Sequence, residues 1–231
     1  METHSNLTTC GFFITFEGID GSGKSVQAQR LSDRLSQSGF EVSLIRDPGG
    51  PPISESIRSL LLDRTLHAMT PLTELFLYEA ARSQLVFETI LPRLRSGLIV
   101  ICDRFFDSTS AYQGYGRSLP LDKILMINEM ACRSLRPHRT YILDISTDES
   151  RRRRRSAGLI DDRMENQEDR FYRKVRDGYL NLGKQNPNRI MVLDGTKSIS
   201  FLEQEILKDT LRCMDRLHPN HFIQKKTGRE Q

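Results

Sequence analysis

The stretch that decides the fold reads Gly18-Ile19-Asp20-Gly21-Ser22-Gly23-Lys24-Ser25. An apolar run at residues 12–16 precedes it, and a segment with helical periodicity at residues 24–38 follows it. Strand, glycine-rich loop and helix in this order are the context in which Gly-x-x-x-x-Gly-Lys-Ser binds a nucleoside triphosphate. Such a loop turns backbone N–H groups toward an anion, and the helix start adds its positive dipole end. We predict that Lys24 reaches the outer phosphates and Ser25 holds magnesium; the alternative is a glycine-rich turn without a ligand.

The bulk composition is that of a single globular domain. The chain has 231 residues, 37% of them hydrophobic and 28% charged, and a formal net charge of +4. No apolar run reaches the length of a membrane span, and residues 1–10 lack the basic start and apolar middle of a secretory signal. The four cysteines show no metal-binding or redox spacing. We therefore predict a cytoplasmic protein without a membrane segment.

Short apolar runs alternate with helical patterns along the chain. Strands are predicted at 12–16, 41–45, 98–102, 140–145 and 190–193, and helices at 24–38, 53–62, 71–96, 121–135, 148–155, 168–186 and 199–217. We expect the long helix at 71–96 to bend near Pro92. The alternation predicts one α/β domain over residues 11–217, with a parallel sheet between helices. Residues 1–10 are predicted to be a flexible N-terminus and residues 218–231 a polar tail.

Ligands of such sheets bind at the carboxyl ends of the strands, so the loops there hold the other candidates. Asp103 and Arg104 directly follow the third strand. Asp103 could hold the water shell of magnesium and Arg104 could grip a phosphate, or the two could form a surface ion pair. Tyr78 and Arg82 lie four residues apart on one helix face. They could bind a base by stacking and hydrogen bonding, although an aromatic residue at helical spacing is more often part of the core.

Residues 151–155 are a run of five arginines, followed by Arg163. The run could be a nucleic-acid patch, a solvated helix end, or a mobile basic lid over a triphosphate. The absence of interleaved aromatic residues weakens the nucleic-acid interpretation. No histidine falls in any motif. This absence suits an acceptor that is a phosphate monoester, whose oxygen is already anionic near neutral pH and needs no general base.

Several motifs together resemble the thymidylate kinase family. They are Glu17 with the loop at 18–25, Arg46-Asp47-Pro48-Gly49-Gly50, Tyr78-Glu79-Ala80-Ala81-Arg82, Asp103-Arg104-Phe105, and Ser108-Thr109-Ser110-Ala111-Tyr112-Gln113-Gly114. The resemblance runs from about residue 12 to residue 207. It implies the single-domain P-loop nucleoside monophosphate kinase fold, with a five-stranded parallel sheet flanked by helices. It also implies transfer of the γ-phosphate of ATP to dTMP for dTTP synthesis, with Mg²⁺, in a homodimer; we expect no nucleic-acid partner.

The resemblance assigns roles to individual residues. In the phosphate loop it implies that Asp20 contacts the sugar 3′-hydroxyl, and it places the magnesium ion between Ser25 and Asp103. It implies that Arg104, helped by Arg58, holds the acceptor phosphate, and that Tyr112 lies against C2′ of the sugar. It implies that Tyr78 and Arg82 bind thymine, with Ser108, Thr109 and Gln113 nearby. The remaining substrate contacts are Asp47 and Pro48 after the second strand, and Glu165 and Tyr172 from the side of a lid at about 151–165.

The chain departs from the family pattern at three places. Tyr78 stands where phenylalanine is usual, and Asp47 stands where glutamate is usual. The phosphate loop carries no arginine while the lid carries many, which resembles the bacterial-type arrangement with a catalytic lid arginine. Arg153 and Arg155 are both candidates for that residue. Two other hypotheses stay open from the sequence: a kinase of another nucleotide, and a nucleotide-binding regulatory or RNA-binding protein that has lost catalysis.

Overall fold

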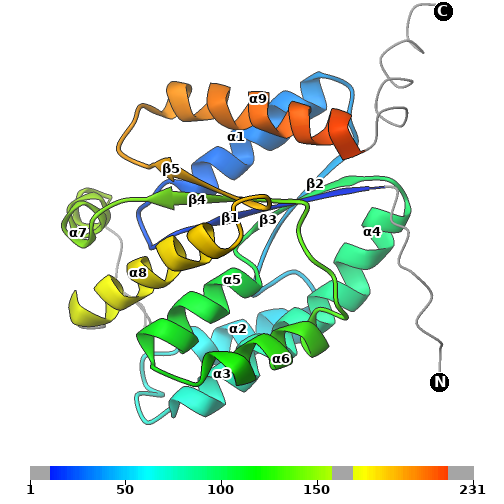
Figure 1. Ribbon diagram of the computed structural model, residues 1–231. Coiled ribbons are helices and arrows are strands. Elements are labelled where there is room, and N and C mark those ends of the chain that lie inside the picture. Colours follow the sequence, from blue (N-terminus) through cyan, green and yellow to red (C-terminus); the bar gives the residue numbers. More distant parts are fainter. Residues whose placement is uncertain (1–10, 158–168, 218–231) are drawn as a thin grey trace, which may run out of the picture.

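The computed structural model describes residues 11–157 and 169–217. Within these ranges a parallel sheet with the strand order β2-β3-β1-β4-β5 forms the centre of the molecule (Figure 1). Its strands are β1 Phe12–Glu17, β2 Val42–Arg46, β3 Ile99–Asp103, β4 Arg139–Asp144 and β5 Ile190–Asp194. All pairs are parallel, so the predicted five-stranded parallel sheet is confirmed.

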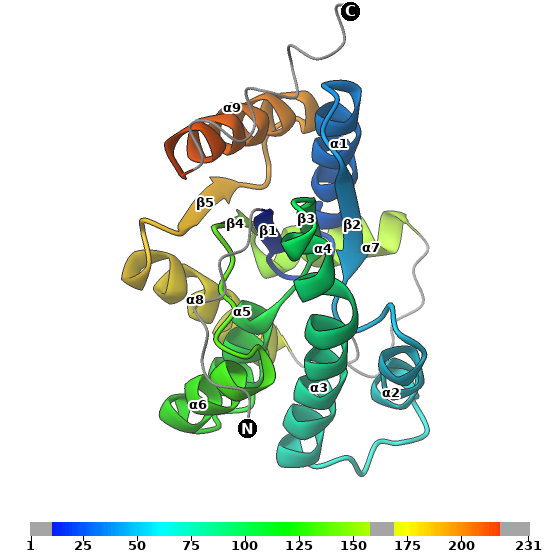
Figure 2. The same cartoon turned by 90° about the vertical axis from the view of Figure 1, so that its right-hand side faces the viewer.

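Helices cover both faces of this sheet. They are α1 Lys24–Gln37, α2 Pro52–Leu62, α3 Pro71–Leu85, α4 Leu91–Arg95, α5 Phe106–Thr109, α6 Leu121–Ala131, α7 Thr147–Ser156, α8 Asp169–Gln185 and α9 Ile199–Leu217, with π-helical segments η1 Val86–Ile90 and η2 Ser110–Gly116. In Figure 2, α1 and α9 lie above the sheet, and α3, α6 and α8 lie below it. No helix in the described ranges combines the length and the apolarity needed to cross a bilayer.

The central strand β1 is buried along its whole length and supplies both layers of the core. Phe12, Ile14 and Phe16 pack in the cluster that α1 and α9 cover. Phe13 packs in the opposite cluster, with residues of α3 and α4. Because side chains alternate along a strand, Glu17 lies on the same face as Phe13, at the carboxyl end where the phosphate loop begins.

Three helical segments differ from the sequence prediction. The helix predicted at 71–96 is divided by η1, which ends just before Pro92, a residue with no backbone N–H to donate to the preceding turn. The helix predicted at 121–135 ends at Ala131, because Arg133 and Ser134 have left-handed φ values of 51° and 60°. Residues 106–116, to which no element was assigned, are helical, and they carry the motif from Ser108 to Gly114.

The predicted domain limits remain predictions. Residues 1–10, 158–168 and 218–231 lie outside the described residues, and they include the proposed terminal segments and the second half of the proposed lid.

Candidate active site

The phosphate-binding loop has the strand–loop–helix geometry that its sequence predicts. It leaves β1 after Glu17, and α1 begins at Lys24. Gly18 has a φ of 133°, and a Cβ atom there would lie 2.6 Å from the carbonyl oxygen of Leu143 in β4. Glycine is required at this position, because any larger residue would clash with backbone and be strained. The loop can therefore present its N–H groups, and the start of α1, to phosphates.

Asp20 in this loop lies between two cations. Its Oδ1 atom is 3.4 Å from Nζ of Lys24 and accepts a hydrogen bond of 2.5 Å from Nη2 of Arg104. Burial alone would raise the pKa of Asp20, but Arg104 and Lys24 outweigh it and hold the pKa well below its ordinary value. Asp20 is thus a permanent hydrogen-bond acceptor, suited to a substrate hydroxyl and unsuited to donating a proton.

Ser25 and Asp103 form a site of oxygen atoms that fits Mg²⁺. The Ser25 hydroxyl donates a short hydrogen bond to Oδ2 of Asp103. The other carboxylate oxygen, Oδ1, is buried and accepts no hydrogen bond from the described residues. Residues 11–157 and 169–217 contain no cluster of three or more His, Cys, Asp or Glu side chains that could hold a metal. An ion held by Ser25 and Asp103 would complete its shell with phosphates and water, as Mg²⁺ commonly does.

Arg104 is held at both its backbone and its guanidinium. It has a left-handed φ of 70°, and its backbone N–H donates to the carbonyl of Phe16 at 2.9 Å. The guanidinium lies 5.1 Å from the centre of the Tyr112 ring. Burial alone would lower the pKa of Arg104, but Tyr112, Asp20 and other neighbours raise it well above its ordinary value. Arg104 is therefore a fixed cation beside the phosphate loop.

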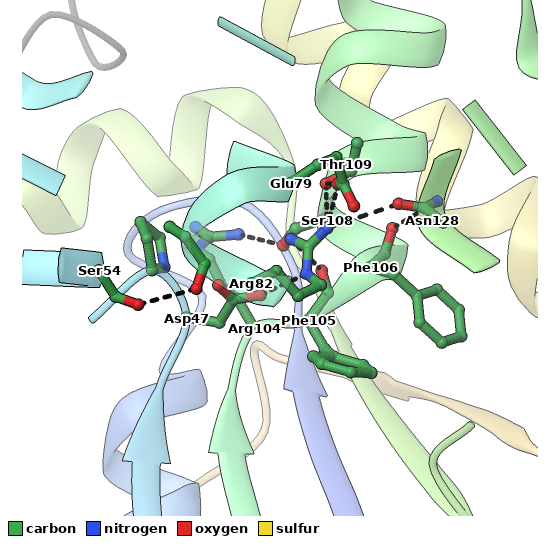
Figure 3. A network of polar contacts seen from close by, with 12 residues as sticks. Asp47, Ser54, Glu79, Arg82, Arg104, Phe105, Phe106, Ser108, Thr109 and Asn128 are labelled. Atoms are coloured by element: carbon green, nitrogen blue, oxygen red, sulfur yellow. Dashed lines mark hydrogen bonds and ion pairs between the residues drawn. The ribbon is translucent and has the colours of Figure 1, made fainter. Parts of the chain in front are cut away.

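Arg82 of α3 is 1% exposed and joins several elements (Figure 3). Its Nε atom donates to Oδ2 of Asp47 at 2.6 Å. On the other side its Nη1 atom donates to Glu79 through a short bond and to Oγ1 of Thr109 at 2.8 Å. Burial raises the pKa of Asp47, although Arg82 opposes the shift. Arg82 thus holds together α3, α5 and the loop after β2.

A cavity of about 250 Å³ opens between these groups. It brings together the phosphate loop, the loop after β2, the α3 face and the η2 segment. Its walls are lined by Asp20, Lys24, Ser25, Arg46, Asp47, Pro48, Arg58, Leu62, Tyr78, Arg82, Asp103, Arg104, Ser108, Thr109, Tyr112 and Gln113. Apart from Tyr172, every described residue predicted to contact dTMP lies in this lining. Tyr78, for which a core position was the alternative, lines the cavity together with Arg82.

Comparison with known proteins agrees with this geometry. A family model described as Thymidylate kinase matches residues 16–206. The chain belongs to the thymidylate kinase family. The thymidylate kinases of Exiguobacterium sibiricum and Pelobacter propionicus are each 44% identical to it, over 87% of this chain and 94% of theirs. The crystal structure of thymidylate kinase from Ehrlichia chaffeensis matches with a TM-score of 0.71 at 36% identity, covering 87% of this chain and 98% of that one. The P-loop nucleoside monophosphate kinase fold expected from the resemblance is thereby confirmed.

Helix rotation gives the five arginines of α7 different surroundings, since consecutive residues point about 100° apart. Arg153 reaches the phosphate loop, because its Nη1 atom is 3.3 Å from the carbonyl oxygen of Gly21. Its Nη2 atom donates a hydrogen bond of 2.9 Å to the carbonyl of Gly195, a residue that follows β5. Arg155 is exposed, and Arg154 lies 5.5 Å over the ring of Tyr172.

One predicted substrate contact among the described residues, Tyr172, is not part of the cavity lining. Tyr172 of α8 is 5% exposed and packs against Phe171 in the core beneath η2, with ring centroids 5.6 Å apart. Its substrate contact stays a prediction. Glu165, like Arg163, lies outside the described residues.

Three polar residues that contact the site received no role from the sequence. Ser150 of α7 donates to the backbone carbonyl of Asp20 at 2.6 Å, which ties α7 to the phosphate loop. Glu17 is fully buried and accepts hydrogen bonds from Ser108 and from Tyr179 of α8. Burial, and after it Asp107, raises the pKa of Glu17 to about 7. The available signal was a charged residue at the end of an otherwise apolar strand; nothing in the local sequence marked Tyr179.

Proposed function

We propose that this chain transfers the γ-phosphate of ATP to the 5′-phosphate of dTMP, giving dTDP. One observation carries the proposal. Lys24, which reaches toward donor phosphates, and Arg104, which holds the acceptor phosphate, both contact the same oxygen of Asp20, at 3.4 Å and 2.5 Å. The donor and acceptor subsites therefore adjoin, as direct transfer between two phosphates requires.

The mechanism depends on alignment and positive charge. The backbone N–H groups of residues 18–25 cradle the phosphates of ATP, and Lys24 accompanies the transferred group. Ser25 and Asp103 would hold Mg²⁺, which neutralises charge on the phosphates. Arg104, helped by Arg58, orients the phosphate of dTMP. That phosphate attacks with an oxygen that is already anionic, so no side chain has to remove a proton.

The rest of the cavity suits a deoxynucleoside. Tyr112 donates to Oδ2 of Asp20 at 3.2 Å, so the phenol ring is fixed beside the group that we assign to the sugar 3′-hydroxyl. A ring fixed there leaves little room for a 2′-hydroxyl. Tyr78 supplies a face for stacking on thymine, and Arg82 is assigned the hydrogen bond to the thymine carbonyl, with Ser108, Thr109 and Gln113 nearby.

Arg153 is the lid arginine that we assign to catalysis. It already touches carbonyl oxygens of Gly21 and Gly195, whereas Arg155 points to solvent. When ATP occupies the loop, the guanidinium of Arg153 has only a short distance to move to a phosphate oxygen. There it would stabilise the charge of the transition state.

The proposal includes a homodimer. Leu72, Phe76 and Phe87 recur at helical spacing along α3 and η1 and are 51%, 53% and 62% exposed. Met126 and Met130 of the neighbouring α6 are 53% and 74% exposed. An apolar surface of this kind suits a second copy of the chain. A cytoplasmic location belongs to the same proposal, by analogy with the family.

The test is an assay of ADP release with ATP and Mg²⁺, across dTMP, dUMP, UMP, CMP, AMP and thymidine. We expect strong preference for dTMP and almost no turnover in Lys24→Ala. Lys123→Ala, which removes an exposed lysine of α6 paired with Asp122, serves as the control and should retain activity. Turnover of another monophosphate would keep the mechanism and overturn the base assignment. Near-normal turnover in a folded Lys24→Ala variant would refute the proposal.

A further inference from the structure

One buried carboxylate, Glu17, stands behind Arg104 and outside the cavity lining. Its Oε1 atom accepts a hydrogen bond of 2.8 Å from the backbone N–H of Phe105. Its Oε2 atom accepts bonds of 2.6 Å from the hydroxyl of Ser108 and 3.0 Å from that of Tyr179. Glu17 and Tyr179 are 0% and 2% exposed. These partners come from α5, α8 and the turn after β3, so one side chain links three elements around Arg104.

The same hydroxyls accept hydrogen bonds from Arg104. Its Nη1 atom lies 3.2 Å from the Ser108 oxygen and 3.1 Å from the Tyr179 oxygen. A hydroxyl has one proton to donate and lone pairs to accept with. When Glu17 is ionised it can only accept, so it takes the proton of each hydroxyl and leaves both hydroxyl oxygens to face the guanidinium. Burial raises the pKa of Tyr179 well above its ordinary value, so its hydroxyl keeps the proton that it donates.

Glu17 also acts on the backbone of Arg104. The left-handed φ of 70° at this arginine is strained for a residue with a Cβ atom, and such a conformation persists only where neighbours hold it. The carbonyl of Phe16 accepts a hydrogen bond from the backbone N–H of Arg104. The carboxylate of Glu17 accepts one from the backbone N–H of the following residue, Phe105. The Glu17 carboxylate therefore restrains both the backbone and, through the two hydroxyls, the guanidinium of Arg104.

We propose that Glu17 and Tyr179 are positioning residues that hold the Arg104 guanidinium in the orientation that receives the phosphate of dTMP. The inference rests on the proposed function. Neither residue reaches the cavity, so both act through Arg104.

The experiment is a double-mutant cycle read as dissociation constants for dTMP and for ATP, measured by calorimetry. Tyr179→Phe removes one hydroxyl and keeps the ring, and we expect it to weaken dTMP binding about 10-fold, the size of one hydrogen bond to a charged group. Glu17→Gln should weaken it more. ATP binding should change by less than about 2-fold in either variant, since Lys24 and the loop keep their contacts.

The cycle adds Tyr179→Phe to Arg104→Ala. If Tyr179 acts through Arg104, the second substitution has almost no further effect on dTMP binding. The matched control is Tyr141→Phe, which removes an equally buried hydroxyl that bonds Thr210 and Asp209 in the α9 layer. It should leave dTMP affinity unchanged even where it lowers stability.

Three results overturn the inference. Tyr179→Phe could bind dTMP as tightly as Tyr141→Phe, its effect could persist in full on Arg104→Ala, or ATP affinity could fall as much as dTMP affinity. Should Glu17→Gln not fold, Tyr179→Phe decides alone. Failure of the proposed function would be seen separately, as absence of dTMP turnover by the wild-type chain.

Discussion

The burial of Arg82 predicts a large loss of stability when its charge is removed. The side chains of Asp47 and Glu79, which flank it, are 0% and 5% exposed. Arg82→Met keeps most of the side-chain volume but leaves these carboxylates without their cation. Removing one partner of a buried ion pair typically costs about 3–5 kcal/mol, a large part of the 5–15 kcal/mol that holds an ordinary domain folded.

The loss should depend on pH in a definite direction. Burial already places the pKa of Asp47 in the folded protein above its value of 3.8 in an unfolded chain, and Arg82 is the main group that lowers it. Without Arg82 the folded state binds the proton still more tightly than the unfolded state does. Stability of the variant then falls as pH rises above the unfolded value. The difference between wild type and Arg82→Met should therefore be larger at pH 8 than at pH 5.

Urea unfolding followed by circular dichroism at both pH values measures this difference. The control is Arg30→Met on α1, which breaks a pair with Glu203 whose arginine is 45% exposed. Exposed pairs contribute about 0–1 kcal/mol, so this variant should change little. If Arg82→Met costs no more than Arg30→Met and yet abolishes dTMP binding, Arg82 is a substrate ligand only, and the structural reasoning is refuted.

Three further predictions concern the site. Asp103→Asn should raise the Mg²⁺ concentration for half-maximal activity at least about 10-fold, because it removes the negative charge at the ion site. The KM for dTMP should change little. An unchanged Mg²⁺ titration would contradict the assignment of Asp103 to the magnesium site. Tyr112→Ala should relax discrimination against the ribose 2′-hydroxyl, and an unchanged dTMP-to-UMP preference would count against that role. Burial raises the pKa of Glu17 from 4.5 to about 7 in the folded protein, so its proton is bound more tightly in the folded state and wild-type stability should fall as pH rises from 4.5 to 7. Glu17→Gln should lack this fall, and equal pH profiles of unfolding for the two proteins would rule it out.

Local patterns account for what could be predicted. Positions 18, 21 and 23 are glycines with positive φ, a property that the motif itself encodes. Alternating strands and helices imply a parallel sheet, and parallel strands bring their carboxyl ends to one edge. These two facts predict that Ser25 and Asp103 lie close together, although 78 residues separate them in the sequence. The resemblance to thymidylate kinases supplied the individual roles, which position alone had left open for Asp103 and Tyr78.

The prediction was weakest where the local pattern is ambiguous. Residues 106–116 are rich in small polar residues and glycine, and they were assigned no element. Packing of η2 against α8 holds them in a helix. The helix at 71–96 was expected to bend near Pro92. It is instead divided by a π-helical turn that precedes the proline, because the missing N–H affects the turn before it.

By itself, the sequence of this protein determined the alternation of strands and helices along the chain, the phosphate loop and the edge of the sheet at which chemistry occurs, because each depends on residues close together in the chain. Only the tertiary structure decided that Arg153 faces the loop, that Arg82 is enclosed by Asp47 and Glu79, and that Glu17 meets Tyr179. The last two residues are separated by 162 positions. A buried polar group must find a partner, but which partner it finds depends on how distant helices pack, and no local pattern records that geometry.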